Sequence, residues 1–318
     1  MKTHALLDQL TDKQKADLKA ILLSDGKTTL SDALAGNSSN KNKCPHCSHL
    51  KFIKIGKTRN VQRYKCKRCN KTFGLNTNTF IHKTHKPLST WDRYIQLMNA
   101  AFPISYIAKE LRISTRTVFY WRHKILNALK QIGSPQLNGI VEVDETFFRL
   151  SYKGQKQGLP RKARKRGGQA KKRGISKEQV CVLTAIDRNK NNWMKSVCLG
   201  RISTQNLEDD FIGKVTADSV LVTDKHSSYT RFCKDQGLQH ESAHASSLRR
   251  GAYHLQNVNS LHSQIKRFMK RFNGVATKYL DNYLVYWQWR NRDVVLALAN
   301  EHAVVSYKAL ANSRMMLK

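Results

Sequence analysis

Two aspartates, Asp144 and Asp224, follow short hydrophobic stretches in this 318-residue chain. Asp144 comes after residues 140–143, which are rich in Ile and Val, and Asp224 comes directly after residues 220–223. These stretches predict buried strands, at whose ends a carboxylate has no packing role. Carboxylates at neighbouring strand ends can share Mg²⁺, because this cation prefers oxygen ligands. Two such ions can activate an attacking water or 3′-hydroxyl and stabilise the leaving oxygen of a phosphodiester.

Each of these aspartates also has a structural alternative. Asp144 could cap the end of its strand, and Asp224 could be the N-cap of a helix predicted over residues 227–236. Alternation along the strand places Glu142 on the same face as Asp144, so Glu142 is a substitute metal ligand.

A third oxygen ligand is expected on a helix that packs against the two strands. Asn259, His262 and Lys266 lie at positions i, i+3 and i+7, so they share one helical face. The Asn259 carbonyl can bind a metal ion without adding charge; the alternative is that Asn259 is only the N-cap of its helix. We expect His254 and His262 to contact substrate or other side chains rather than metal.

Four of the seven cysteines form two CxxC pairs with eighteen residues between them. Two such pairs suit a tetrahedral Zn²⁺ site in a zinc ribbon, whose metal ligands are Cys44, Cys47, Cys66 and Cys69. A ribbon this small folds only by binding its metal. The odd cysteine count argues against a disulfide framework. The other three are expected to be small buried residues: Cys181, Cys198 and Cys233.

The charge balance points to a polyanionic partner. Lys and Arg number 57 against 22 Asp and Glu, a formal net charge of +35, which repels itself unless a polyanion is near. Nucleic acid is the expected partner. A membrane surface is the competing partner, but the chain has no apolar run of about 18 residues and no charged-then-apolar leader. We therefore expect a soluble protein of the cytoplasm, associated with the nucleoid and not with a membrane.

A helix-turn-helix is predicted between residues 104 and 125. Residues 104–111 read as a short amphipathic helix, and a tight turn leads to Ser114, which can cap a second helix. Val118, Trp121 and Ile125 would pack inward. The second helix is expected to present these residues to a DNA major groove: Thr115, Arg116, Thr117, Tyr120 and Lys124.

Residues 153–177 contain eleven Lys or Arg, five Gly and no acid, so this segment cannot form a core. It follows the Asp144 strand, which favours an arm that clamps DNA near that aspartate; the alternative is a solvated surface loop. The basic residues expected to contact DNA are Arg161, Lys162, Arg164, Lys165, Arg166, Lys171, Lys172 and Arg173.

Downstream of Asp144 the pattern predicts a hairpin of two strands, a helix near residues 204–212, the strand before Asp224 and another helix. This order is typical of a ribonuclease-H-like fold, which places acids of its first and fourth strands side by side. The fold class is therefore mixed α/β, with a mixed five-stranded sheet flanked by helices. The predicted regions are an N-terminal helical segment (1–40), a zinc ribbon (41–75), a helix-turn-helix domain (88–132), a catalytic domain (138–295) and a C-terminal helix (296–318).

Five segments together carry a family resemblance. They are the two CxxC pairs, residues 141–146, the basic arm, residues 222–229, and residues 254–267. On these segments the chain resembles bacterial insertion-sequence transposases of the DDE superfamily, in the group with a zinc ribbon, a helix-turn-helix and a ribonuclease-H-like catalytic domain. The resemblance covers roughly residues 40 to 292.

The resemblance implies roles for the candidate residues. Asp144 and Asp224 become the first two ligands of catalytic Mg²⁺ or Mn²⁺, and Asn259 stands where most relatives have Glu, although some members carry Asn. Lys266 matches a basic residue that contacts substrate phosphate. The implied partners are double-stranded DNA, both element ends and target, and further copies of the chain. The implied activity is metal-dependent DNA cleavage and strand transfer.

Two other functions fit part of the pattern. A catalytically inactive, sequence-specific DNA-binding regulator derived from a transposase would explain the neutral Asn259. A ribonuclease-H-type repair nuclease would explain the paired aspartates but not the helix-turn-helix.

Overall fold

A computed structural model describes most of the chain in two compact units. The described residues are 40, 42–58, 61–130, 134, 136–155, 157–160, 172–243 and 251–291. The boundary between the two units falls within one helix, between Phe119 and Tyr120, and each unit is described by itself. The predicted N-terminal helix, the C-terminal helix and arm residues 161–171 lie outside the described residues.

The first unit begins with a small antiparallel sheet, β1 to β3. Its strands are Phe52–Thr58, Val61–Cys66 and Thr72–Gly74, in the order β1-β2-β3. Aromatic rings from each strand pack together: the Phe52 centroid lies 5.3 Å from those of Tyr64 and Phe73. This apolar cluster is small, and the cysteines complete it.

Three helices follow: α4 (Leu88–Asn99), α5 (Ile104–Glu110) and α6 (Thr115–Lys130). The Ser114 hydroxyl accepts the backbone N–H of Thr117 at 3.0 Å, so it caps α6 as predicted. The Tyr94 hydroxyl of α4 donates to the Val118 carbonyl at 3.2 Å. The helix, turn and helix expected from the sequence are thus α5, residues 111–114 and α6.

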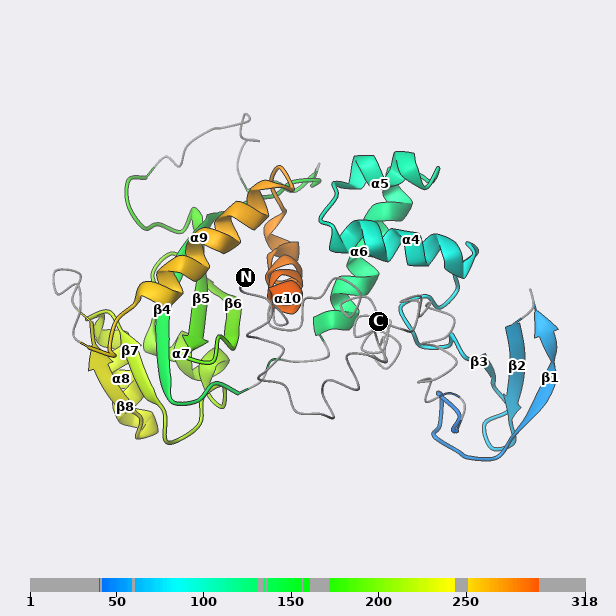
Figure 1. The fold of residues 1–318 in the computed structure, drawn as a ribbon, viewed down its shortest axis with the longest axis horizontal. Coiled ribbons are helices and arrows are strands. Elements are labelled where there is room, and N and C mark those ends of the chain that lie inside the picture. The colour runs from blue at the N-terminus through cyan, green and yellow to red at the C-terminus, as the bar shows by residue number, and fades with distance from the viewer. Residues whose placement is uncertain are drawn as a thin grey trace, which may run out of the picture. The chain divides into compact units, whose positions relative to one another are not determined.

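The second unit contains a five-stranded mixed sheet in the order β6-β5-β4-β7-β8 (Figure 1). The strands β4 (Ile140–Arg149), β5 (Gln179–Asp187) and β6 (Asn192–Leu199) are antiparallel, whereas β7 (Val220–Thr223) and β8 (Gln239–Ser242) run parallel to β4. Helices α7 (Thr204–Phe211) and α8 (Ser227–Gln236) connect β6 to β7 and β7 to β8. The predicted ribonuclease-H-like order is confirmed.

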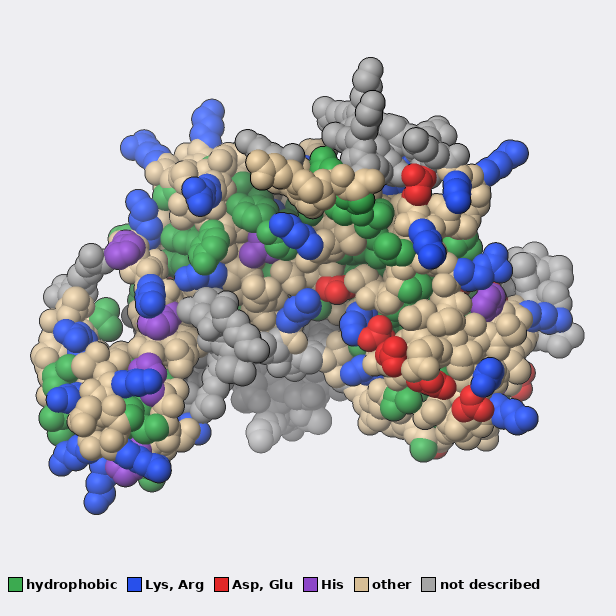
Figure 2. Space-filling view, turned by 180° about the vertical axis from the view of Figure 1, so that it is seen from behind, with side chains coloured by type: hydrophobic (Ala, Val, Ile, Leu, Met, Phe, Trp, Pro, Cys, Tyr) green, Lys and Arg blue, Asp and Glu red, His purple; other side chains and the backbone are tan. Residues whose placement is uncertain are grey.

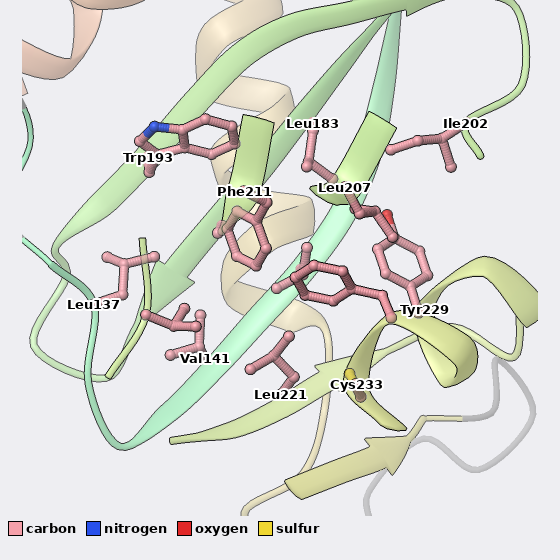
Figure 3. Close-up of a cluster of buried hydrophobic side chains, with 14 of the residues drawn as sticks. Leu137, Val141, Leu183, Trp193, Ile202, Leu207, Phe211, Leu221, Tyr229 and Cys233 are labelled. Carbon is pink, nitrogen blue, oxygen red and sulfur yellow. The ribbon is translucent and has the colours of Figure 1, made fainter. Parts of the chain in front are cut away.

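The two faces of β4 have different neighbours. Val141 and Val143 point into an apolar core that includes Phe211 of α7 and Tyr229 of α8 (Figure 3). The opposite face meets α9 (Gln256–Lys270), which contacts β4 and β5, and α10 (Leu280–Asn291) contacts β6. Even-numbered residues of β4 therefore face α9, and odd-numbered ones face the core.

The scattered cysteines of this unit behave nearly as expected. Cys181 and Cys233 are buried, whereas Cys198 is only half-buried. Within the described part of the chain, no helix combines the length and apolar character that crossing a bilayer requires.

Candidate active site

Asp144 and Asp224 lie side by side where β7 ends. The parallel pairing of β4 with β7 runs to Glu142 opposite Val222. Each aspartate follows two residues later, Asp144 within β4 and Asp224 just after β7. Together with Glu145 they form a group whose carboxylate oxygens lie within 4.8 Å of one another. The fold thus brings the two predicted aspartates together and adds a third acid.

The expectation that Asp144 ends its own strand was wrong. β4 continues to Arg149, and Asp144 pairs with Thr184 of β5 in mid-strand. The strand that ends is β7, at Thr223, so beyond Glu142 β4 has no partner on that side among the described strands. Asp144 is held by its pairing with β5 and lies on the face of β4 that α9 covers.

The cluster destabilises negative charge on Asp144. Burial is the main cause that raises the pKa of Asp144 to about 7, and the nearby carboxylates of Glu145 and Asp224 add to it. The Glu145 backbone N–H and the Lys266 ammonium oppose this rise in pKa. A divalent cation would reverse the balance, because it attracts the carboxylates that otherwise repel one another.

Glu145 is held from the core side of the sheet. The hydroxyl of Tyr229, which is fully buried on α8, donates to Glu145 Oε1 at 2.7 Å. Burial raises the pKa of Glu145, and the hydrogen bond from Tyr229 lowers it. Tyr229 therefore orients the third carboxylate toward Asp144 and Asp224.

His262 approaches Asp144 from α9. Thr184 Oγ1 donates to the Asp144 carbonyl at 2.8 Å, so it accepts from His262 Nε2 at 2.6 Å. Burial lowers the pKa of His262 to about 4, and the ring is neutral at pH 7. Its Nδ1 therefore carries a lone pair and lies 3.9 Å from Asp144 Oδ2. His262 Nδ1 and Asp144 Oδ2 are both acceptors, so a hydrogen-bond donor or a cation that binds beside them can contact both.

Asn259 and Lys266 are on the same helix as His262 and share its face. Asn259 is the fourth residue of α9, and its backbone N–H bonds to the Leu255 carbonyl at 3.1 Å. It is exposed and is not the N-cap, a position that Leu255 occupies. Lys266 is exposed and close enough to lower the pKa of both Asp144 and His262.

Two further alternatives also fail on geometry. Glu142 shares the face of Asp144, as alternation predicts, but it lies outside the acidic group and binds the start of α9. Asp224 does not occupy the N-cap of α8, because His226 does, and Asp224 Oδ1 instead accepts the His226 backbone N–H at 3.0 Å.

The donor set of the acidic cluster fits a hard divalent cation. Asp144, Glu145 and Asp224 offer carboxylate oxygens from two neighbouring segments, and oxygen ligands of this kind suit Mg²⁺ or Mn²⁺. Burial, and to a smaller extent the neighbouring carboxylates, raise the pKa of Asp144, so a bound cation would favour its ionised form.

The same part of the chain matches a known family. Residues 136–292, which include the sheet, the acidic cluster and α9, match the model of the ISXO2-like transposase domain. A protein of the transposable element ISH50 from Halobacterium salinarum, itself uncharacterized, is 27% identical over 255 residues, with 78% of this chain and 84% of that protein covered. Residues 136–292 therefore belong to the ISXO2-like transposase domains. The resemblance inferred from the sequence motifs is thereby confirmed.

Solved structures similar to this chain include the mariner Mos1 paired end complex with Mg, with a TM-score of 0.31, 12% identity, and 74% of this chain and 82% of that chain covered. Another is the simian T-cell lymphotropic virus intasome, with a TM-score of 0.31, 11% identity, and 63% and 68% covered. Because these scores are low, the fold assignment rests on the strand order and the family match.

The first unit has a second group of metal-ligand side chains, in its small antiparallel sheet and turns. The sulfur atoms of Cys44, Cys47, Cys66 and Cys69 all lie within 4.8 Å of one another. Backbone N–H groups of His46 and Arg68 each donate to a cysteine sulfur at 3.4 Å. Hydrogen bonds from the backbone, led by that of Cys69, lower the pKa of Cys66 to about 6, whereas burial raises the pKa of Cys44 to about 11. This cluster is compatible with the predicted zinc ribbon.

The predicted DNA-contacting residues are placed unevenly. On α6, Thr115, Arg116 and Tyr120 are exposed, and Thr117 and Lys124 are half-buried. The three residues expected to pack inward, Val118, Trp121 and Ile125, are buried. In the basic arm, Lys172 and Arg173 are described and exposed, whereas Arg161, Lys162, Arg164, Lys165, Arg166 and Lys171 lie outside the described residues.

Figure 2 shows where charge gathers on one face of each unit. Lys and Arg cover the ribbon with His among them, and residues 41–79 contain no acid. The second unit shows a group of acidic side chains, and α7 carries Glu208, Asp209 and Asp210 on the side of the sheet away from α9. Phosphate would therefore meet little repulsion at the ribbon.

The sequence did not reveal several residues of the site. Thr184 and Tyr229 contact the acidic group from β5 and α8, and Glu145 joins it. Adjacency to Asp144 was the only available signal for Glu145, and alternation argued against it because neighbours in a strand face opposite ways.

Proposed function

We propose that the protein is a DNA transposase that binds the ends of its insertion sequence, cleaves them in a metal-dependent reaction and joins them to target DNA. The observation that carries this proposal is the carboxylate group of Asp144, Glu145 and Asp224 within an ISXO2-like transposase domain. Cleavage and joining are both in-line displacements at phosphorus, so one site can perform both.

In this proposal the carboxylates of Asp144 and Asp224 hold the catalytic Mg²⁺ or Mn²⁺, with Glu145 and the Asn259 amide as further oxygen ligands. The bound ions would activate the attacking oxygen and stabilise the leaving one. The neutral Nδ1 of His262 can accept a hydrogen bond from a group bound beside Asp144. Lys266 would bind substrate phosphate one turn beyond His262.

The remaining charged surfaces would bind double-stranded DNA. We infer that the exposed face of α6 reads the major groove, and that the acid-free ribbon, stabilised by Zn²⁺ at its four cysteines, and the arm contact phosphates. Because two element ends must be bound together, we expect the protein to act as a homo-oligomer. Its DNA substrate places it on the nucleoid, in the cytoplasm. Mos1 has been solved as a paired end complex and as a strand transfer complex.

The test is cleavage of a duplex carrying the terminal repeat that flanks the gene, with Mg²⁺ or Mn²⁺. Asp144→Ala and Asp224→Ala should each lower the rate by about a thousandfold or more, because each removes a ligand of the reacting centre. Asp209→Ala is the matched control, since this exposed acid lies on α7, and it should cleave like the wild type. Undiminished cleavage by either active-site variant would refute the proposal.

The neutral Asn259 favours one other function, an inactive DNA-binding regulator. That protein would bind element ends in a salt-sensitive manner and give no metal-dependent products. The variants Asn259→Ala and Asn259→Glu decide the role of this position. A metal ligand requires that Ala lower the cleavage rate by about 10- to 100-fold and that Glu retain it; equal rates for both variants would exclude a ligand role.

A further inference from the structure

Glu142 is the most deeply buried carboxylate of the second unit that the acidic cluster does not use. It has no exposed surface and lies on β4, two residues before Asp144 and on the same face. A carboxylate in this position is costly unless donors surround it. Its partners therefore indicate why β4 carries an acid here.

Those partners come from the start of α9 and from the end of β5. Glu142 Oε2 accepts the backbone N–H of Val258 at 3.0 Å, and Oε1 accepts the side-chain amide of Asn257 at 2.6 Å. The Arg188 guanidinium, just after β5, forms an ion pair with Oε1 and also donates to the Ala252 carbonyl ahead of α9. The His254 ring nitrogen Nδ1 lies 3.3 Å from Oε1.

These contacts replace a cap that α9 lacks. Leu255 stands at the N-cap position, where it has no oxygen to offer, and the first turn of α9, all of it described, contains no acid. The Val258 N–H belongs to the third residue of the helix, which an N-cap side chain normally binds. Glu142 supplies that oxygen from β4, and its charge also suits the positive end of the helix.

The capped turn leads directly into the catalytic face of α9. Asn259 is the residue after Val258, and His262, one turn later, reaches Asp144 and Thr184. The sheet thus holds α9 at two points, Glu142 of β4 at the first turn and Thr184 of β5, through His262, at the second, along the helix that crosses the sheet in Figure 1. Two points fix both the position and the rotation of a helix, whereas one point leaves the rotation free.

We propose that Glu142 is a positioning residue: by capping α9 from β4, it sets how Asn259 and Lys266 face Asp144. This inference rests on the proposed function for its effect on cleavage, but the attachment itself is a property of the fold. If Glu142 had only a structural role, its removal would lower stability alone. If Glu142 positions α9, its removal should also reduce the contribution that Asn259 makes to cleavage.

The experiment compares Glu142→Gln with Asp187→Asn in the full-length zinc-loaded protein. Asp187 is an equally buried acid of the same sheet, and it accepts Asn191 groups in the β5–β6 turn rather than on α9. Hydrogen exchange of residues 256–260 should accelerate by about tenfold or more in Glu142→Gln and stay unchanged in Asp187→Asn. Unchanged exchange in Glu142→Gln overturns the proposal.

A double-mutant cycle with Asn259→Ala supplies the functional readout. Glu142→Gln should weaken Mn²⁺ binding, measured by calorimetry, by about tenfold and slow single-turnover cleavage at saturating DNA by about a hundredfold. Adding Asn259→Ala should cost little more, because the displaced helix has already withdrawn that side chain. If the losses of cleavage rate caused by the two single substitutions multiply in the double variant, the proposal is overturned. A wild-type protein that cleaves no duplex refutes the proposed function, while the exchange and Mn²⁺ data still decide the role of Glu142.

Discussion

The cysteine cluster of the ribbon and the acidic cluster of the sheet are both sets of metal-ligand side chains, but they are built in opposite ways. The cysteines stand on two turns of one short segment, beside a core of only a few aromatic rings. The acids come from β4 and from the segment after β7, whose strands share a large core with α7 and α8. In the ribbon the ligands must hold the fold together, whereas in the sheet the fold holds the ligands together.

Removal of zinc gives the largest expected effect. Chelation, or Cys66→Ser, should unfold the ribbon, because structural zinc contributes about 10–16 kcal/mol to small domains of this kind. Proteolysis within residues 42–78, followed by mass spectrometry, would detect the loss, while the second unit keeps its melting temperature. Cys198→Ser is the control, since this half-buried cysteine lies outside the cluster and should leave the zinc content unchanged. A zinc-free ribbon that resists proteolysis would remove the contrast between the two clusters.

Removal of an acidic ligand should raise the free energy of unfolding, whereas removal of zinc should lower it. In the absence of Mg²⁺ and Mn²⁺ at pH 8, Asp144→Asn should stabilise the second unit by about 2–4 kcal/mol, because it removes a charge that burial and two carboxylates disfavour. Urea unfolding of the zinc-loaded protein measures this change. Asp209→Asn, on the exposed side of α7, should change stability by less than about 0.5 kcal/mol. A destabilised Asp144→Asn protein would show that this acid supports the fold.

Stability and Mn²⁺ affinity should both change with pH as Asp144 ionises. Because the pKa of Asp144 is raised from 3.8 to about 7 in the folded protein, its charge costs stability progressively as pH rises from about 4 to about 7. Mn²⁺ needs the ionised form, so Mn²⁺ affinity should increase over that range by up to about tenfold per pH unit and level off above it. Calorimetry in two buffers of different ionisation enthalpy should detect the release of about one proton at pH 6. Asp144→Asn should abolish that proton release.

Tyr229→Phe should give the smallest effect. It deletes the hydroxyl that donates to Glu145 and leaves a buried carboxylate short of one partner, at a cost of about 1–2 kcal/mol at pH 7. In a Glu145→Gln background the same substitution should cost less, because no charged acceptor remains. Equal costs in both backgrounds would mean that Tyr229 acts through packing alone.

Local patterns predicted much of the fold. The CxxC spacing located the ribbon, Ser114 located the start of α6, and alternating and continuous hydrophobic runs located β4, β5, β6 and β7. Helix α8 spans the predicted residues 227–236. These features depend on residues close in sequence, whose backbone geometry leaves few choices.

The site was only partly predictable because its contacts join distant segments. The hydrophobic runs before Asp144 and Asp224 looked like strand ends, yet β4 continues to Arg149, whereas its neighbour β7 ends at Thr223. Strand alternation correctly gave the face of Glu142 but not its function, which depends on where α9 begins. Tyr229 and Thr184 have no sequence pattern that would connect them to an acid.

The sequence by itself therefore determined which chemical groups the protein has: four thiols in two local pairs, aspartates after hydrophobic strands, and a helical face with Asn259, His262 and Lys266. The tertiary structure alone decided which acids meet, because parallel pairing of β4 with β7 sets the register that places Asp144 beside Asp224. It also decided that Glu142 leaves the metal cluster to cap α9. Local spacing fixes a site when two turns of one short segment supply its ligands, and strand register fixes it when the ligands come from separate strands.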